Sequence, residues 1–157
     1  MKNVFFYNLS KVNIGIAEED KAIAGVFFGR KIPAGFVKAE TPLIKKAAGQ
    51  IAEYLEGKRK VFSLPLVLHG TEFQKTVWRA LQTIPYGETR SYKDIAILAG
   101  SPKAFRAVGL ANNRNPISII IPCHRVIGSN GDLVGYGGGL PLKKYLLELE
   151  RVPNTKR

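Results

Sequence analysis

The chain has 157 residues, of which 45% are hydrophobic, and 24 lysines and arginines against 12 acidic residues give it a formal net charge of +12. That length suffices for one well-formed core or two small lobes, and the longest apolar runs are far too short to cross a bilayer. So basic a chain favours a polyanionic partner, and since no basic amphipathic helix with a wide apolar face stands out, nucleic acid is favoured over an anionic membrane.

Cysteine and histidine are scarce in this sequence. Cys123 is the only cysteine, so it cannot form an intramolecular disulfide, and with only His69 and His124 it makes a poor ligand set for zinc. We therefore expect no metal, and no glycine-rich loop with nucleotide-binding spacing suggests a cofactor. The N-terminal segment lacks the apolar stretch of a secretory signal, and a free thiol suits a reducing compartment, so we expect a cytoplasmic protein.

The first 65 residues predict a small α/β lobe. Residues 12–17 and 22–28 are strand-like and bracket a polar turn, which indicates a hairpin. A threonine–proline pair then opens a helix that carries apolar residues at four-residue spacing and stops at Gly57. We predict a small antiparallel sheet plus this helix in residues 1–65, followed by another strand-like run over 61–70.

Residues 66–157 predict a mostly helical lobe. Thr71 and Ser91 each open a capping box, the first before an apolar stripe and the second before a short helix that Gly100 ends. A third helix is predicted to open at residues 101–102 and to run to about Asn113. Two short helices joined by a glycine turn are typical of a helix-turn-helix, although an ordinary helical hairpin looks the same.

The single cysteine lies in the segment PCHRV, residues 122–126, directly after the β-branched run ISIII. A thiol beside a histidine and an arginine is where a thiolate is favoured, because nearby positive charge lowers a thiol pKa. Taken alone, the same placement also suits a small buried residue at the end of a strand.

Several further motifs accompany this segment between residues 70 and 150. They are IPYGET (84–89), SY (91–92), RAVG (106–109), NP (115–116), GYGGG (135–139) and LLELE (146–150). In this order and spacing the chain resembles the O6-alkylguanine-DNA alkyltransferases, the methylated-DNA–protein-cysteine methyltransferases. The resemblance implies direct repair of alkylated bases in double-stranded DNA, O6-alkylguanine first and O4-alkylthymine as a further candidate lesion.

The resemblance also implies roles for four catalytic residues. Cys123 would be the nucleophile that takes the alkyl group, His124 its base through a bridging water, and Glu150 the carboxylate that orients the imidazole. Tyr92 would donate its hydroxyl to the departing purine. Because a thioether resists hydrolysis and no second cysteine or cofactor can regenerate the thiol, the protein should turn over once.

In the family, the third helix is the recognition helix and enters the minor groove. The resemblance places at Arg106 the arginine that fills the gap left by the flipped nucleotide. The other DNA-binding candidates are Lys103, Ala107, Gly109 and Arg114. The basic residues suit phosphate and the small ones suit close approach to the groove, whereas Phe105 and Leu110 are bulkier than expected there.

A pocket for the flipped base is implied as well. Its candidate residues are Asn115, Val126, Tyr136, Gly137 and Gly138. Tyr136 and the glycines would form a wall over the base, the Val126 backbone would accept from its exocyclic amine, and Asn115 would tie the recognition helix to the active-site strand. Arg125 is expected to pair structurally or to contact phosphate.

Two other functions remain open. A helix-turn-helix DNA-binding protein with a structural cysteine would explain the charge and the helices but not the Cys-His-Arg cluster or the GYGGG loop. A cysteine hydrolase with a Cys-His-Glu triad would need an acyl substrate and gives no reason for the charge of +12. We expect a monomer that binds DNA and no membrane, with cooperative binding along DNA undetermined.

Overall fold

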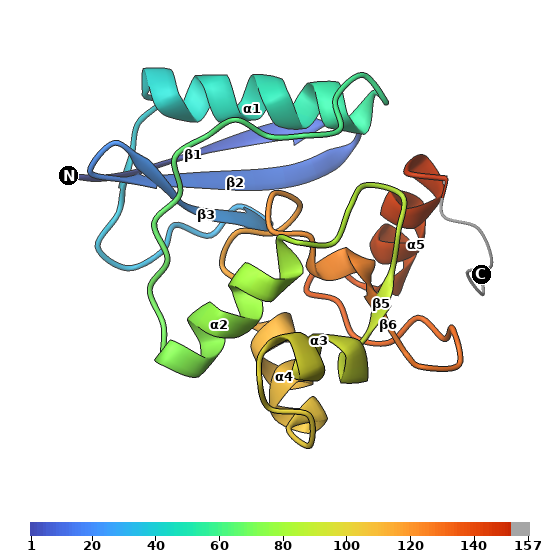
Figure 1. The fold of residues 1–157 in the computed structure, drawn as a ribbon. Helices are drawn as coiled ribbons and strands as arrows, with labels where there is room; N and C mark the ends of the chain where they lie inside the picture. Colours follow the sequence, from blue (N-terminus) through green and yellow to red (C-terminus); the bar gives the residue numbers. More distant parts are fainter. Residues whose placement is uncertain (152–157) are drawn as a thin grey trace. The chain divides into compact units, whose positions relative to one another are not determined.

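A computed structural model gives the structure of residues 1–151 (Figure 1). Contacts group the chain into two units, which are described separately. Unit 1 comprises Met1–His69 and Pro116–Ile120, and unit 2 comprises Gly70–Asn115 and the residues from Ile121 onward. Over the range that the structure describes, no helix combines the length and the apolar character needed to cross a membrane.

Unit 1 is built on a four-stranded sheet in the order β3-β2-β1-β4. Its strands are β1 (Lys2–Leu9), β2 (Val12–Glu19), β3 (Ala22–Phe28) and β4 (Val37–Lys38). The predicted hairpin is confirmed, and its turn at Asp20 and Lys21 has positive φ at both positions, the turn type whose twist matches that of the paired strands. The antiparallel part continues into β1, while β4 adds to β1 in parallel and makes the sheet mixed.

Helix α1 (Pro42–Leu55) covers one face of this sheet (Figure 1). Its predicted cap is confirmed, since the Thr41 side chain accepts from the Ile44 backbone N–H at 3.1 Å and Gly57 takes a positive φ just past the helix. The apolar face of α1 and the inner strand residues form the core of unit 1. Its fully buried members include Val4, Ile14, Ile16, Ile23, Val26, Ile44, Ile51 and Tyr54.

Two segments with strand-like sequence, residues 61–70 and 117–121, do not form strands. In residues 61–70 only Leu66 pairs with a strand, in a single parallel bridge to Ile23, and Pro65 beside it has no N–H to extend a ladder. In the β-branched run before the cysteine only Ile117 bridges to β3, after which the chain turns and Ile119 adopts a φ of 72°. Cys123 therefore follows a turn rather than the end of a strand, because only Ile117 of this run pairs with a strand.

As far as residue 151, unit 2 contains four α-helices and a two-stranded parallel sheet. The elements are α2 (Glu72–Leu81), β5 (Arg90–Ser91), α3 (Tyr92–Leu98), α4 (Phe105–Asn113), β6 (Val126–Ile127) and α5 (Leu140–Leu149). Both predicted capping boxes form: Thr71 exchanges hydrogen bonds with Gln74, and Ser91 with Asp94. Both helices thus start where the local sequence predicts.

Helix α4 begins later than predicted. Ser101 accepts from the Ala104 backbone N–H at 2.9 Å and lies in a turn, so the helix starts only at Phe105. Ala104 occupies the N-cap position and has no side-chain group to cap it. Lys103 therefore precedes the helix. The α4 backbone also receives the Trp78 indole, which is buried and donates to the Ala111 carbonyl at 2.9 Å.

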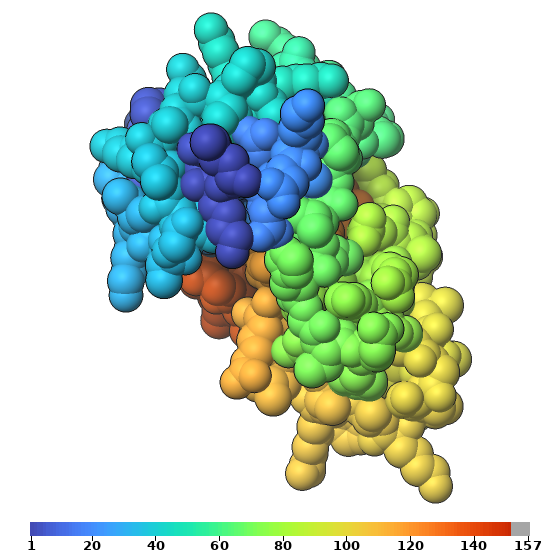
Figure 2. Space-filling view, turned by 90° about the vertical axis from the view of Figure 1, so that its left-hand side faces the viewer, coloured from blue at the N-terminus to red at the C-terminus, as the bar shows by residue number. Residues whose placement is uncertain are grey.

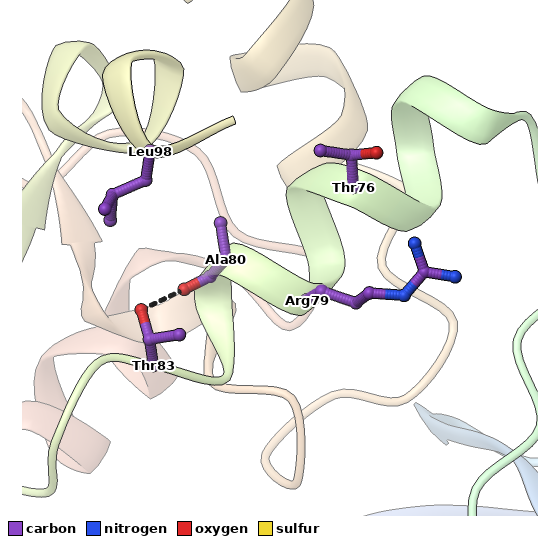
Figure 3. Close-up of a pocket in the computed structure, with 5 residues that line it drawn as sticks. All are labelled: Thr76, Arg79, Ala80, Thr83 and Leu98. Atoms are coloured by element: carbon purple, nitrogen blue, oxygen red, sulfur yellow. Dashed lines mark hydrogen bonds between the residues drawn. The ribbon is translucent and has the colours of Figure 1, made fainter. Parts of the chain in front are cut away.

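A pocket of about 280 Å³ lies between α2 and α3 (Figure 3). Its lining residues are Thr76, Arg79, Ala80, Thr83 and Leu98. The Thr83 hydroxyl donates to the Ala80 carbonyl at 2.6 Å, so it is held against its own helix end rather than directed into the pocket as a donor. None of the predicted site residues lines this pocket.

Candidate active site and nucleic-acid interface

Cys123 begins a 3₁₀ turn, Cys123–Arg125, which is labelled η1. The cysteine residue is only 4% exposed, and its backbone N–H donates to the Ile121 carbonyl at 2.8 Å. Asn115 donates its side-chain amide to the same Ile121 carbonyl at 2.7 Å. The Asn115 side chain, two residues after the end of α4, is therefore hydrogen-bonded to the carbonyl that also accepts from the Cys123 backbone.

A single carboxylate organises the residues after the cysteine. Glu150, at the C-terminal end of α5, accepts from His124 Nε2 at 2.8 Å, from Arg125 Nε at 2.9 Å and Nη2 at 3.0 Å, and from the Gly87 backbone N–H at 3.1 Å. Burial by itself would raise the pKa of Glu150, but the hydrogen bonds and charges of His124 and Arg125 outweigh it and lower that pKa to about 2. The carboxylate is thus ionised throughout the physiological range.

His124 is fully buried, and its environment favours the neutral imidazole. Burial lowers the pKa of His124 below its ordinary value, although the contact with Glu150 opposes the shift. An ionised carboxylate can only accept hydrogen bonds, so Nε2 carries the hydrogen and Nδ1 is the basic nitrogen. A neutral, oriented imidazole beside a thiol can take up the thiol proton, directly or through one water.

Two tyrosines lie close to this cluster. The ring of Tyr136 meets the His124 ring edge-on, with centroids 6.5 Å apart, and Tyr92 donates its hydroxyl to the Val134 carbonyl at 2.9 Å. Burial, with a contribution from negative charge at Cys123, raises the pKa of both phenols. Both hydroxyls therefore keep their protons at neutral pH and can act as donors.

The remaining predicted pocket residues surround the loop between β6 and α5. Val126 is fully buried in β6 and its carbonyl faces α5, whereas Gly137 is exposed and Gly138 is half-buried in the loop. Gly135 and Gly139 have positive φ, which lets the loop turn around Tyr136 without a steric penalty. The loop thus places the Tyr136 ring edge-on against His124, and the backbone at the next residue, Gly137, is exposed to solvent.

Helix α4 presents a basic and apolar face to solvent. Arg106 and Ala107 are exposed on the helix, and Lys103 and Arg114 are exposed at its two ends. Phe105 and Leu110 are 48% and 55% exposed. Figure 2 shows long side chains of the yellow-to-gold stretch, which contains α3 and α4, extending from the surface.

Gly109 is partly buried on α4, one turn after Phe105 and Arg106. A Cβ at that position would come 3.7 Å from two ring carbons of Tyr92, an ordinary contact distance. The glycine therefore brings the α4 backbone close to Tyr92, so that the exposed helix and the candidate purine donor are neighbours.

The chain is similar in sequence and in fold to several known proteins. Residues 72–152 match the family model described as the DNA-binding domain of 6-O-methylguanine DNA methyltransferase. The chain is 50% identical over 153 residues to the methylated-DNA–protein-cysteine methyltransferase of Methanosarcina barkeri, covering 92% of this chain and 96% of that protein. It is 46% identical over 158 residues to the constitutive enzyme of that name from Bacillus subtilis, covering 94% and 96%.

The chain belongs to the methylated-DNA–protein-cysteine methyltransferase family. Its fold is also similar to the crystal structure of Mycobacterium tuberculosis OGT in complex with DNA, with a TM-score of 0.88 and 42% identity over 97% of this chain and 96% of that one. The predicted fold class is thereby confirmed: an N-terminal α/β part precedes a mostly helical part.

In this member of the methyltransferase family, sequence analysis missed one buried polar residue of the site. Lys143 is completely buried on α5 beneath the pocket loop. A signal was present, because Lys143, Leu146, Leu147 and Glu150 follow the i, i+3, i+4, i+7 spacing of one helix face. Two charged residues on an otherwise apolar helix face indicate side chains that are buried and hydrogen-bonded to partners in the core, rather than side chains exposed to solvent at the edge of that face.

Proposed function

We propose that this protein repairs O6-alkylguanine in DNA by transferring the alkyl group to Cys123 in a single turnover. The observation that carries the proposal is the buried cluster of Cys123, His124 and Glu150 in a chain of this family. Cys123 directly precedes His124 on η1, burial favours the neutral imidazole, and a carboxylate holds that imidazole through Nε2. This arrangement supplies what a thiolate nucleophile needs, a nearby base of defined orientation.

The reaction is a displacement at the alkyl carbon. His124 Nδ1 takes the thiol proton, the thiolate sulfur forms a bond to that carbon, and the bond between the carbon and guanine O6 breaks. Negative charge then develops on the departing guanine, and the Tyr92 hydroxyl is the protonated donor that can stabilise it. The product is a thioether, so the protein itself is consumed as the alkyl acceptor.

The alkylated base must first leave the duplex, because its alkyl group points into the stacked helix. We interpret α3 and α4 as the helix-turn-helix, with Arg106 as the side chain that replaces the flipped nucleotide. Lys103 and Arg114, exposed at the two ends of α4, would contact phosphates. Asn115, Val126, Tyr136, Gly137 and Gly138 would line the pocket for the base.

Organisation and location belong to the same proposal. Residues 66–157 would form the DNA-binding and alkyl-transfer domain, after an N-terminal lobe of residues 1–65. A nucleophilic thiol needs a reducing compartment, so we place the protein in the cytoplasm, acting as a monomer.

Intact mass after incubation with a duplex that contains O6-methylguanine tests the proposal. We expect one added methyl group per protein, mapped by peptide analysis to Cys123, and no further gain with excess DNA. Cys123→Ala should bind the duplex with nearly unchanged affinity and gain no mass. Binding without any methyl gain by the unmodified protein would instead favour a DNA-binding module with a structural cysteine.

A further inference from the structure

Lys143 is a charged side chain buried without a carboxylate partner. The residue is 0% exposed, and among residues 1–151 it forms no salt bridge. Its ammonium instead donates to three backbone carbonyls, those of Val126 at 2.6 Å, Val134 at 2.7 Å and Gly135 at 3.1 Å. Burying an unpaired charge costs free energy that an apolar side chain would not, so this lysine calls for a specific explanation.

The three carbonyls lie on two segments of the candidate site. Val126 is in β6, immediately after the turn that carries Cys123, and Val134 and Gly135 immediately precede Tyr136 in the pocket loop. An ammonium has three hydrogens and can satisfy all three acceptors at once. Lys143 thus ties the segment after the nucleophile to the loop that carries the proposed wall of the base pocket.

Val134 is shared between two donors. Its carbonyl accepts from Lys143 and also from the Tyr92 hydroxyl at 2.9 Å. If Tyr92 is to donate to a departing purine, its hydroxyl must first release this carbonyl. When Tyr92 releases this partly exposed carbonyl, the second bond from Lys143 keeps it hydrogen-bonded and in place.

We propose that Lys143 is the positioning residue of the base pocket: it holds the Val134–Gly135 loop on the nucleophile segment while Tyr92 exchanges its carbonyl acceptor for the substrate. The inference rests on the proposed alkyl transfer and adds a residue that touches neither the thiol nor the base.

The first test compares Lys143→Met with the matched control Lys144→Met, which removes the same charge from the half-buried neighbouring position. Two rates are measured in each: single-turnover methyl transfer from an O6-methylguanine duplex, and alkylation of Cys123 by iodoacetamide, which needs no base pocket. Lys143→Met should slow methyl transfer roughly ten- to a hundredfold, which corresponds to the loss of one to two hydrogen bonds. The rate of alkylation by iodoacetamide should stay within about threefold of that of the unmodified protein. Lys144→Met should change neither rate by more than about twofold.

An unchanged transfer rate in folded Lys143→Met would overturn the inference, and so would a parallel fall of both rates, which indicates a general structural role. Failure of the proposed function looks different, because the unmodified protein would then gain no methyl group in the first place.

A second test needs no variant of uncertain stability. Burial lowers the pKa of Lys143 to about 8, with negative charge at Cys123 opposing the shift. Above that pH the neutral amine has two hydrogens for three carbonyls. The other titratable groups of the cluster are Cys123 and His124 on η1, Tyr92 on α3, Tyr136 in the loop and Glu150 on α5. The phenols have raised pKa values and the imidazole and carboxylate lowered ones, so none of these four groups titrates together with Lys143 in this range.

Because the thiolate reacts in both assays, the ratio of the methyl-transfer rate to the iodoacetamide rate cancels its titration. We expect this ratio to fall as the pH rises through about 8 in the unmodified protein and to stay level in Lys143→Arg, whose guanidinium does not titrate. The free energy of unfolding should instead rise as the pH goes from about 8 to 10.5, because over this range the unfolded chain binds a proton that the folded Lys143 has lost. A ratio that stays level in the unmodified protein contradicts the inference.

Discussion

His124 Nε2 lies 2.8 Å from Glu150 Oε2, and both side chains are fully buried. The same carboxylate is also held by two guanidinium nitrogens of Arg125. Arg125 therefore supplies the positive charge that balances Glu150, and the imidazole can remain neutral beside it. A base that is neutral and held in one orientation is ready to accept a proton from the adjacent thiol.

Glu150→Gln should slow alkyl transfer without abolishing it, because a neutral amide orients His124 less well than a carboxylate and stabilises its charged form poorly. It should also lower the free energy of unfolding by about 3 kcal/mol, since the buried Arg125 guanidinium loses its counter-ion. Single-turnover rates and denaturant unfolding measure the two effects. Glu148→Gln, at an exposed position on the same helix, is the control and should change neither. If the rate is unchanged in a folded Glu150→Gln, the proposed relay is wrong even when Cys123 is the nucleophile.

Arg106→Ala should impair repair of duplex DNA far more than reaction with free O6-benzylguanine. The free base needs no extrusion, so a side chain that holds the flipped state has no effect on it. We expect at least a tenfold difference between the two losses, about 1.4 kcal/mol. Arg114→Ala removes a cation from the other end of α4 and should weaken DNA binding without this selectivity. Equal losses on both substrates would place Arg106 in the chemistry or in folding.

Salt should weaken DNA binding linearly on a log–log scale, because lysines and arginines displace condensed counter-ions from phosphates. Lys103→Gln should make that slope shallower by about one unit, the contribution of one phosphate contact. The matched variant Lys58→Gln removes a surface charge that lies next to Glu56 in unit 1 and should leave the slope unchanged. An affinity that does not depend on salt would contradict the role assigned to the net charge.

Acid should destabilise the fold in two stages. Because the pKa of His124 is lowered in the folded protein, the unfolded chain binds a proton at a pH where the folded chain does not. The free energy of unfolding therefore falls as the pH drops below about 6.5. The pKa of Glu150 is lowered from 4.5 to about 2, so its contribution is complete above pH 4.5 and is lost as the pH falls towards 2. Denaturant unfolding from pH 7 to 3 checks both stages. His124→Gln should remove the first stage and Glu150→Gln the second, and a curve that is unchanged in both variants would exclude this origin.

Local sequence determined the parts of this protein whose partners lie within a few residues. The capping boxes at Thr71 and Ser91 and the hairpin turn at Asp20 form as predicted because each depends on contacts across two or three residues. Membership of the family was also predictable, since its motifs are short and contiguous. Where a local pattern lacked a partner in space it misled, as with the β-branched run before Cys123, in which only Ile117 meets a strand.

Tertiary structure alone decided the environment of the charged residues on α5. Sequence analysis proposed Glu150 as the partner of His124 only by resemblance and gave Lys143 no role. The folded chain brings Glu150 to residues 25 and 26 positions away and encloses Lys143 among three carbonyls. The physical reason is desolvation, which shifts a pKa and strengthens a hydrogen bond. Desolvation depends on the groups that surround a side chain in space, and the neighbouring residues in the sequence do not determine it.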